Sequence, residues 1–86
     1  MRTPGAGEPP ADDEPPFRIH TAGSIGAAIR HYRARAGLTQ EELAARSGLD
    51  RTYLSRLERG LETEQLRRIV AVFRQLGVRI TLRRED

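Results

Sequence analysis

The fold of this chain is decided by residues 38–60, which read LTQEELAARSGLDRTYLSRLERG. Thr39 can cap a helix through its hydroxyl group, and Glu42, three residues further on, can bind back to the capping residue. Gly48 stands where this helix must end, because glycine adopts the left-handed backbone conformation at no steric cost. Asp50 can cap the helix that follows. The stretch therefore predicts two short helices joined by a tight turn.

The second of these helices divides into an apolar and a polar face. Leu54 and Leu57 are three residues apart and are expected to face inward together with Leu49. The residues expected to face outward are Arg51, Thr52, Tyr53, Ser55 and Arg56. Arginine in such a helix can pair both acceptors of a guanine edge in the major groove, and hydroxyl groups suit phosphates or bases. The polar face predicts DNA binding, and a solvated arginine-rich surface is the alternative.

Apolar spacing predicts one helix before this pair and another after it. The earlier helix is expected to run from a Thr21 cap to Gly37, with an apolar side made of Ile25, Ile29, Tyr32 and Ala36. The later helix is expected to run from a Thr63 cap to Gly77. Its expected core positions are Leu66, Ile69, Val70, Phe73 and Leu76, and its expected outward residues are Arg67, Arg68 and Arg74. Residues 17–77 are thus predicted to be an all-α domain of about four to five helices.

A pattern of period two follows the last helix. Val78, Ile80 and Leu82 alternate with polar residues, which predicts a strand. A lone strand leaves its backbone groups unpaired, and the sequence offers no second strand except the short stretch 17–19. The expected partner is the same strand of a second copy across a two-fold axis, so residues 78–86 are predicted to be a dimerisation strand and tail. A frayed C-terminal extension is the alternative.

The chain changes character at residue 17. Residues 1–16, MRTPGAGEPPADDEPP, contain all five prolines and no large apolar residue beyond Met1, which predicts a disordered acidic tail. Residues 1–18 carry two arginines and four acids, a balance of −2, and residues 19–86 carry thirteen arginines and eight acids, a balance of +5. The part expected to fold is therefore basic, which favours association with DNA.

Composition disfavours several other classes of protein. The chain has no cysteine, which excludes disulfides and thiolate metal sites, and no apolar run approaches the roughly 20 residues of a membrane span. His20 and His31 have no further ligand at metal spacing, and Asp12 and Asp13 lie in the tail, where no fixed geometry would support acid–base catalysis. We expect a cytoplasmic, nucleoid-associated protein that is not an enzyme and has no cofactor or metal.

Between Ile25 and Val78 the chain resembles the Cro/C1 (XRE) family of repressors. The matching residues are Gln40 at the start of the second helix, Gly48 in the turn and Glu58 at the end of the recognition helix. The resemblance implies a lambda repressor-like helix-turn-helix domain. It implies base reading by Arg51, Thr52 and Arg56 and phosphate contacts by Gln40, Tyr53 and Ser55. It also implies a structural ion pair between Arg33 and Glu58.

Two flanking segments are similar to the HipB-type antitoxins. They are residues 17–33, FRIHTAGSIGAAIRHYR, and residues 76–82, LGVRITL. This similarity implies a homodimer, joined by its terminal strands, that represses its own operon at a palindromic operator and binds a HipA-like kinase toxin. Toxin contacts would then include Arg35, Arg67 and Arg74. A stand-alone XRE-family regulator and a protein-interaction module with the same fold are the alternatives.

Overall fold

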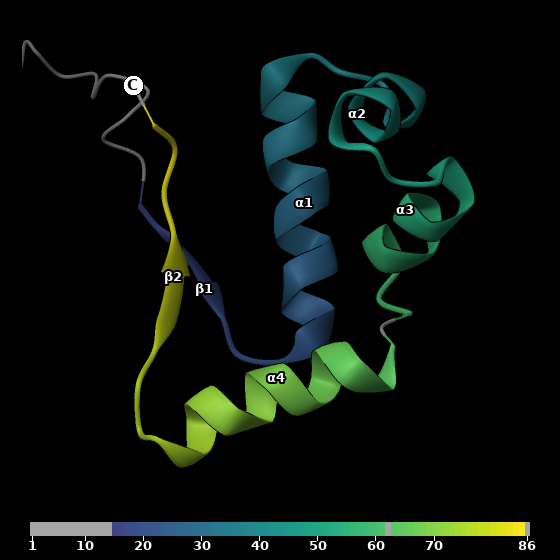
Figure 1. Cartoon of the computed structure of the whole chain (residues 1–86). Helices are drawn as coiled ribbons and strands as arrows, with labels where there is room; N and C mark the ends of the chain where they lie inside the picture. Colours follow the sequence, from purple (N-terminus) through teal and green to yellow (C-terminus); the bar gives the residue numbers. More distant parts are fainter. Residues whose placement is uncertain (1–14, 62, 86) are drawn as a thin grey trace, which may run out of the picture.

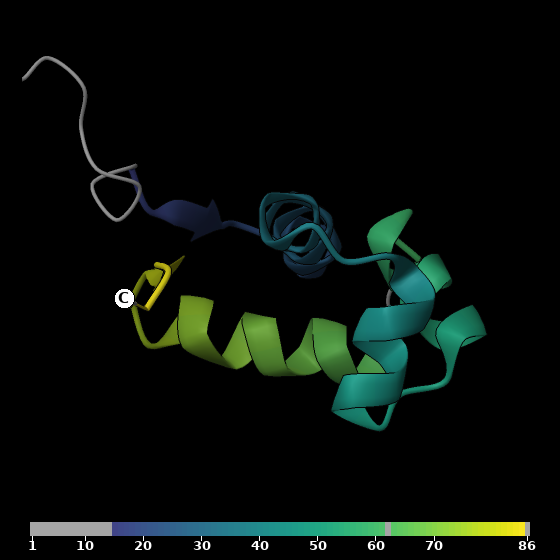
Figure 2. The same cartoon turned by 90° about the horizontal axis from the view of Figure 1, so that it is seen from above.

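The computed structural model describes residues 15–61 and 63–85 of the chain. The helices are α1 (Ala22–Ala36), α2 (Gln40–Ser47), α3 (Arg51–Glu58) and α4 (Glu64–Gln75), and the strands are β1 (Phe17–Ile19) and β2 (Ile80–Leu82). α1 lies between the strand pair on one side and α2 and α3 on the other, and α4 crosses α1 at a steep angle (Figures 1 and 2). The prediction of a domain of four to five helices with a C-terminal strand is confirmed. The predicted disordered tail, 1–16, lies outside the described residues except for Pro15 and Pro16.

Short side chains and glycines set the ends of the helices as predicted. Thr21, Thr39 and Thr63 each accept a hydrogen bond from the backbone N–H three residues on, and Thr39 also forms the predicted reciprocal pair with Glu42. Asp50 caps α3 by accepting a hydrogen bond of 2.7 Å from the N–H of Thr52. These bonds satisfy N–H groups that lack a partner at the start of a helix.

The core lies mainly between α1 and α3. Leu54 and Leu57 are buried as expected, and Ala28 of α1 is fully buried. Gly26 allows this close packing, because a Cβ atom at its position would lie 1.7 Å from the carbonyl oxygen of Leu57. The apolar spacing of α1 did not identify Gly26. Among the described glycines, Gly26 is the one at which an added Cβ atom would come closest to the backbone of another helix.

Two predictions of buried residues are wrong. Leu49 is exposed. It follows Gly48, which has the left-handed conformation, and its backbone N–H donates a hydrogen bond to the carbonyl oxygen of Ala44 at the end of α2. On α4 the core prediction holds fully only for Val70, and Leu66 is half-buried. The other predicted core residues of this helix are exposed, namely Ile69, Phe73 and Leu76. The reason is that the described chain packs against only one edge of the apolar side of α4.

The C-terminal strand pairs within the chain, with the short stretch 17–19 that the sequence left as the one second candidate, whereas a second copy was the expected partner. β1 and β2 pair antiparallel, with Phe17 opposite Leu82 and Ile19 opposite Ile80. The hydroxyl of Tyr32 on α1 donates a hydrogen bond of 3.0 Å to the carbonyl oxygen of Leu82, which holds β2 beside the helix. Val78, predicted to be part of the strand, precedes it. The stretch 17–19 could be named as a candidate, but three residues show too little alternation to predict that they pair with β2.

Candidate nucleic-acid interface

The outward residues of α3 form the surface that the sequence assigned to DNA. Arg51, Thr52, Tyr53 and Arg56 are exposed, and Ser55 is half-buried. Thr52 and Arg56 are four residues apart and therefore lie on the same face of α3. Arg51 is the first residue of this helix. The buried Leu54 and Leu57 hold the opposite side of α3 against the core. α3 thus presents two guanidinium groups and two hydroxyl groups from a helix whose inner face is packed.

A partly buried ion pair fixes α3 relative to α1. The Nε and Nη2 atoms of Arg33 donate hydrogen bonds of 2.7 and 2.9 Å to the two carboxylate oxygens of Glu58, the last residue of α3. Arg33 also donates from Nη1 to the carbonyl oxygen of Leu38, at 3.0 Å. The hydrogen bonds from Arg33 hold the pKa of Glu58 below its usual value, although burial acts in the opposite direction. Both carboxylate oxygens are therefore occupied and Glu58 is charged.

Gln40 joins this ion pair to the start of α2. Its Nε2 atom donates a hydrogen bond of 3.0 Å to Oε1 of Glu58. The sequence assigned Gln40 to a DNA phosphate, and its link to Glu58 was not foreseen. One side-chain network thus connects α1, the start of α2 and the end of α3. It sets the angle between the two helices of the helix-turn-helix unit.

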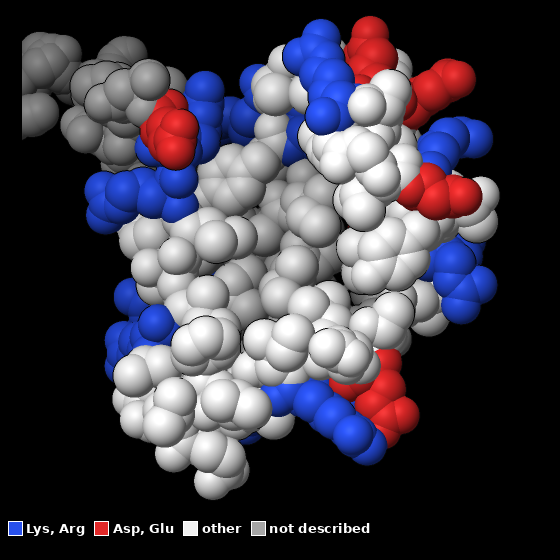
Figure 3. Space-filling view, viewed as in Figure 1, with Lys and Arg blue, Asp and Glu red and all other residues white. Residues whose placement is uncertain are grey.

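Charge on this side of the molecule is mixed. Figure 3 shows arginine and acidic side chains interspersed around α2 and α3. The acids include Glu42, whose hydrogen bonds within the Thr39 cap lower its pKa, and Asp50, which caps α3. Because the acids lie between the arginines, the position of each guanidinium on α3 matters more for recognition than the net charge.

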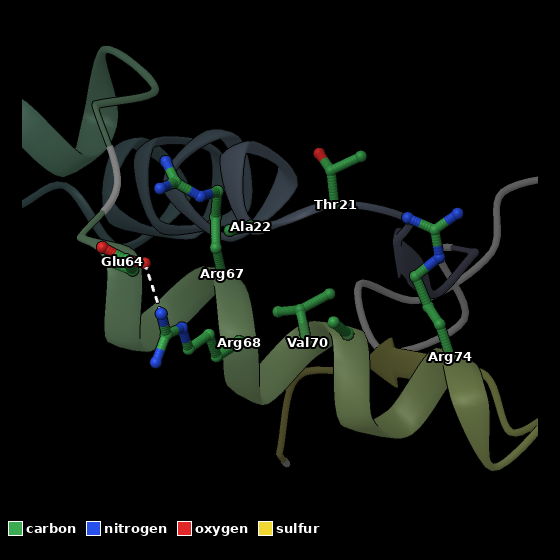
Figure 4. Close-up of a pocket in the computed structure, with 8 residues that line it drawn as sticks. Thr21, Ala22, Glu64, Arg67, Arg68, Val70 and Arg74 are labelled. Atoms are coloured by element: carbon green, nitrogen blue, oxygen red, sulfur yellow. Dashed lines mark hydrogen bonds and ion pairs between the residues drawn. The ribbon is translucent and has the colours of Figure 1, made fainter.

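Three arginines line a separate hollow between α4 and the start of α1 (Figure 4). Arg67 and Arg74 project from α4 toward the side of the hollow that includes Thr21 and Ala22, and Arg68 turns toward Glu64. Arg68 pairs with Glu64 at 2.7 Å in an exposed bridge one helical turn long. Arg35, which the resemblance grouped with Arg67 and Arg74, lies in the last turn of α1, at the other end of that helix. The structure therefore brings Arg67 and Arg74 together and leaves Arg35 apart.

The two histidines lie apart: His20 directly precedes Thr21 of the hollow, and its backbone N–H donates a hydrogen bond of 3.3 Å to Oγ of Ser24. His31 packs against two aromatic rings, with its centroid 5.5 Å from that of Phe17 and 4.9 Å from that of Tyr32. Within residues 15–61 and 63–85, no three histidine or carboxylate side chains are grouped as metal ligands would be. None of the helices in this part of the chain has the length and apolar character needed to cross a lipid bilayer.

Comparison with known proteins agrees with this geometry. A helix-turn-helix family matches residues 29–82, which span all of α2, α3 and α4. The chain is 35% identical over 65 residues to the uncharacterized HTH-type transcriptional regulator y4mF of Sinorhizobium fredii (strain NBRC 101917 / NGR234), an alignment covering 76% of this chain and 86% of the relative. It is 41% identical over 54 residues to the uncharacterized HTH-type transcriptional regulator y4dJ of the same strain, covering 63% and 70%.

A third relative matches a shorter stretch. This is the HTH-type transcriptional regulator SlrR of Bacillus subtilis (strain 168), 49% identical over 39 residues, which are 45% of this chain and 26% of the relative. No solved structure matches the chain. The extent of the family match and of the first alignment shows that the chain belongs to the Cro/C1-type (XRE) helix-turn-helix family.

Proposed function

We propose that this protein is a sequence-specific DNA-binding transcriptional repressor that acts as a homodimer on a palindromic operator. The observation that carries the proposal is the exposure of Arg51, Thr52 and Arg56 on a helix whose angle is set by the Arg33–Glu58 pair. The relatives named as HTH-type transcriptional regulators support it. Such a repressor acts in the cytoplasm, on the DNA of the nucleoid.

The proposed contacts divide into two classes. Arg51, Thr52 and Arg56 contact base edges in the major groove, where an arginine can donate to both O6 and N7 of guanine. Gln40, Tyr53 and Ser55 contact phosphates and fix the register of the protein on the duplex. In a two-fold dimer the paired α3 helices enter half-sites roughly 34–36 Å apart, one helical turn of DNA.

Footprinting tests the proposal as a whole. The purified protein is titrated onto its own promoter region in the presence of competitor DNA and at several salt concentrations. We expect protection of a palindrome and an affinity that falls steeply with salt, because each phosphate contact releases counterions. Binding to all sequences alike, without a protected site, would contradict sequence-specific repression.

The variant Arg56→Ala tests the assignment of base contacts. We expect it to weaken operator binding by roughly 1–3 kcal/mol and to relax the preference at one base position, measured against operators substituted one base pair at a time. Arg74→Ala is the matched control, because it removes the same charge from α4, in the hollow of Figure 4, and leaves α3 intact. A loss for Arg56→Ala that is equal on all operators would make Arg56 a phosphate contact.

We further propose that the repressor is the autoregulating antitoxin of a HipA/HipB-like module. Support comes from the two segments that are similar to HipB-type antitoxins, since one contains β1 and the other contains β2, and these strands pair. Arg67 and Arg74 are the proposed toxin contacts that lie together, and Arg35 would contact a toxin separately.

Co-expression with the product of the adjacent gene tests the antitoxin assignment. A stable complex with a kinase-like protein, weakened by Arg67→Ala or Arg74→Ala, is the expected result. An adjacent gene of another kind, together with an intact footprint, would instead identify a stand-alone XRE-family regulator. A protein complex that resists salt, without any footprint, would identify a protein-interaction module.

A further inference from the structure

An exposed apolar surface lies on α4, and it contains five of the nine large hydrophobic residues that are exposed among the described residues. Its members are Ile69, Val72, Phe73 and Leu76 on the helix, which are 46%, 55%, 39% and 67% exposed, and Val78 just after it, which is 49% exposed. The N–H of Val78 donates a hydrogen bond of 3.2 Å to the carbonyl oxygen of Phe73, which keeps Val78 next to the end of the helix. We call these five residues the α4 strip.

The strip exists because the apolar side of α4 is wider than the surface that covers it. Successive residues of an α-helix are about 100° apart around its axis. Viewed along that axis, the apolar residues of α4 occupy an arc of about 160°, with Val72 at one end and Val70 at the other. Only the edge of this arc at Leu66 and Val70 is half-buried or buried. The charged residues of α4 lie outside the arc, and they are Glu64, Arg67, Arg68 and Arg74. The strip therefore offers an uncharged surface.

Charge borders the strip near the start of α4, where Glu64 and Arg68 line a shallow hollow together with Ile69 and Val72. In Figure 3 the start of α4 carries charge at the lower right, and the part of the helix toward β2 presents an uncharged surface. This surface continues into a hollowed, uncharged face that is bounded by β2 on one side and by α2 and α3 on the other (Figures 1 and 3). The strip itself is made of exposed apolar side chains, which favours an apolar occupant.

We propose that a second copy of this chain covers the α4 strip, with the two α4 helices antiparallel across a two-fold axis that passes between Val72 and Phe73. In this register Ile69 faces the partner subunit's Leu76, and Val72 lies close to the partner subunit's Val72 beside the axis. The contact between Ile69 and the partner subunit's Leu76 occurs twice, as an isologous interface requires. The inference rests on the proposed function, since it locates the contact that holds the repressor dimer together.

The size of the strip is consistent with such a dimer. From their exposed fractions, its side chains leave about 450 Å² per copy open to solvent, at the scale of the largest apolar patches on monomers, which are often functional. Two copies would bury about 900 Å² of apolar surface, and a rim that includes Gln65 and Arg68 would bring the total toward the roughly 1,200–2,000 Å² of stable interfaces.

This interface differs from the strand contact expected from the sequence. One edge of β2 is already paired with β1, so β2 no longer needs a second copy to satisfy that edge. Its outer edge is three residues long and offers few backbone bonds. The α4 strip has the larger apolar area to remove from water, and burial of apolar area is the main driving force of most association.

Sedimentation of charged variants tests the interface. We expect the wild-type chain to be a dimer and Val72→Glu to be a monomer with an unchanged helical circular dichroism spectrum, because Val72 is exposed within one chain. Ala71→Glu is the matched control, since it adds the same charge at the next position of α4 but on the side of the hollow in Figure 4, and it should remain a dimer. A Val72→Glu dimer, with Ile80→Glu monomeric, would overturn the inference in favour of the strand interface.

Cross-linking tests the register. The chain has no cysteine, so a single Val72→Cys substitution can form a disulfide only with its counterpart in a second copy. We expect rapid formation of a reducible dimer by Val72→Cys and not by Ala71→Cys, and equal rates for the two variants would contradict the register.

Footprinting of the same variants separates this inference from the proposed function. A wild-type monomer that still protects a palindrome would overturn the α4 interface and leave the repressor assignment standing. A dimer that Val72→Glu dissociates, but that protects no DNA site, would support the interface and contradict the repressor assignment.

Discussion

Glu58 is a buried carboxylate whose hydrogen bonds reach two other helices. Arg33 of α1 and Gln40 of α2 both donate to it, and Glu58 itself ends α3. Because the side chain of Glu58 is only 3% exposed, removal of Arg33 would leave a charge with little access to water. The orientation of the proposed recognition helix therefore depends on residues that do not need to touch DNA.

The pH dependence of stability should report on Glu58. Its folded-state pKa is lowered, chiefly by hydrogen bonds from Arg33, so the stabilisation it provides is complete above the unfolded value, about 4.3, and is lost as the pH falls through the folded pKa. We expect Glu58→Gln to lower the free energy of unfolding at pH 7 by roughly 1–3 kcal/mol, and this difference should shrink as the pH falls toward 3. Urea denaturation across this range measures it.

Glu64→Gln is the control for this experiment. Its carboxylate pairs with Arg68 in an exposed bridge, so the change should cost less than about 1 kcal/mol. A difference between wild type and Glu58→Gln that stays constant from pH 7 to pH 3 would show that the charge of Glu58 does not contribute as described.

At the scale of elements, the contact between α1 and α3 positions the helix-turn-helix unit. Gly26 lies where the two backbones meet. Any side chain at this position would collide with the carbonyl group of Leu57. Gly23 lies in the same helix, and the nearest atom to a Cβ there would be Oγ1 of Thr21 at 3.7 Å. Two glycines of one helix thus have different structural roles.

This difference gives a matched pair of variants. Gly26→Ala should push α3 away from α1 and lower the free energy of unfolding by about 3 kcal/mol, because the obstacle is backbone. Gly23→Ala should be neutral or raise it by up to about 1 kcal/mol, since alanine is the better helix former. Thermal and urea denaturation of both variants measures these changes. Equal effects would show that the close approach at Gly26 is not a constraint.

At the scale of the whole molecule, the described chain leaves part of its apolar surface uncovered. α4 is tied to the rest by Val70 and by the half-buried Leu66, while the α4 strip remains open to solvent. A small domain buries a smaller fraction of its surface than a large one, so cover from a second copy would add substantially to its stability. Folding and dimerisation are then expected to be coupled.

Coupling of this kind makes the melting temperature depend on protein concentration. We expect the midpoint of thermal unfolding to rise with concentration for the wild-type chain, because a partner that binds only the folded state stabilises it by mass action. Val72→Glu should melt at a lower temperature that does not change with concentration. A wild-type midpoint that stays constant across a hundredfold range of concentration, as expected of a monomer, would contradict the coupling.

Features that depend on neighbours in the sequence were predictable. The caps at Thr39 and Asp50 act on backbone groups two or three residues away, so their residue types and spacing were enough to locate the helices. The inward positions of Leu54 and Leu57 followed from helical periodicity for the same reason. The outward side of α3, and hence the surface proposed to read DNA, could be identified without the tertiary structure.

Features that join distant segments were not predictable from these local patterns. The role of Gly26 depends on a carbonyl group of α3, and the pairing of β1 depends on a strand at the other end of the chain. The exposure of Ile69 and Leu76 depends on how much of α4 the other helices reach. The sequence by itself determined which residues form helices and which sides of them are polar, because caps and periodicity act within a few residues. Only the tertiary structure decided which apolar sides are buried within one chain, because burial depends on the elements that pack against each helix.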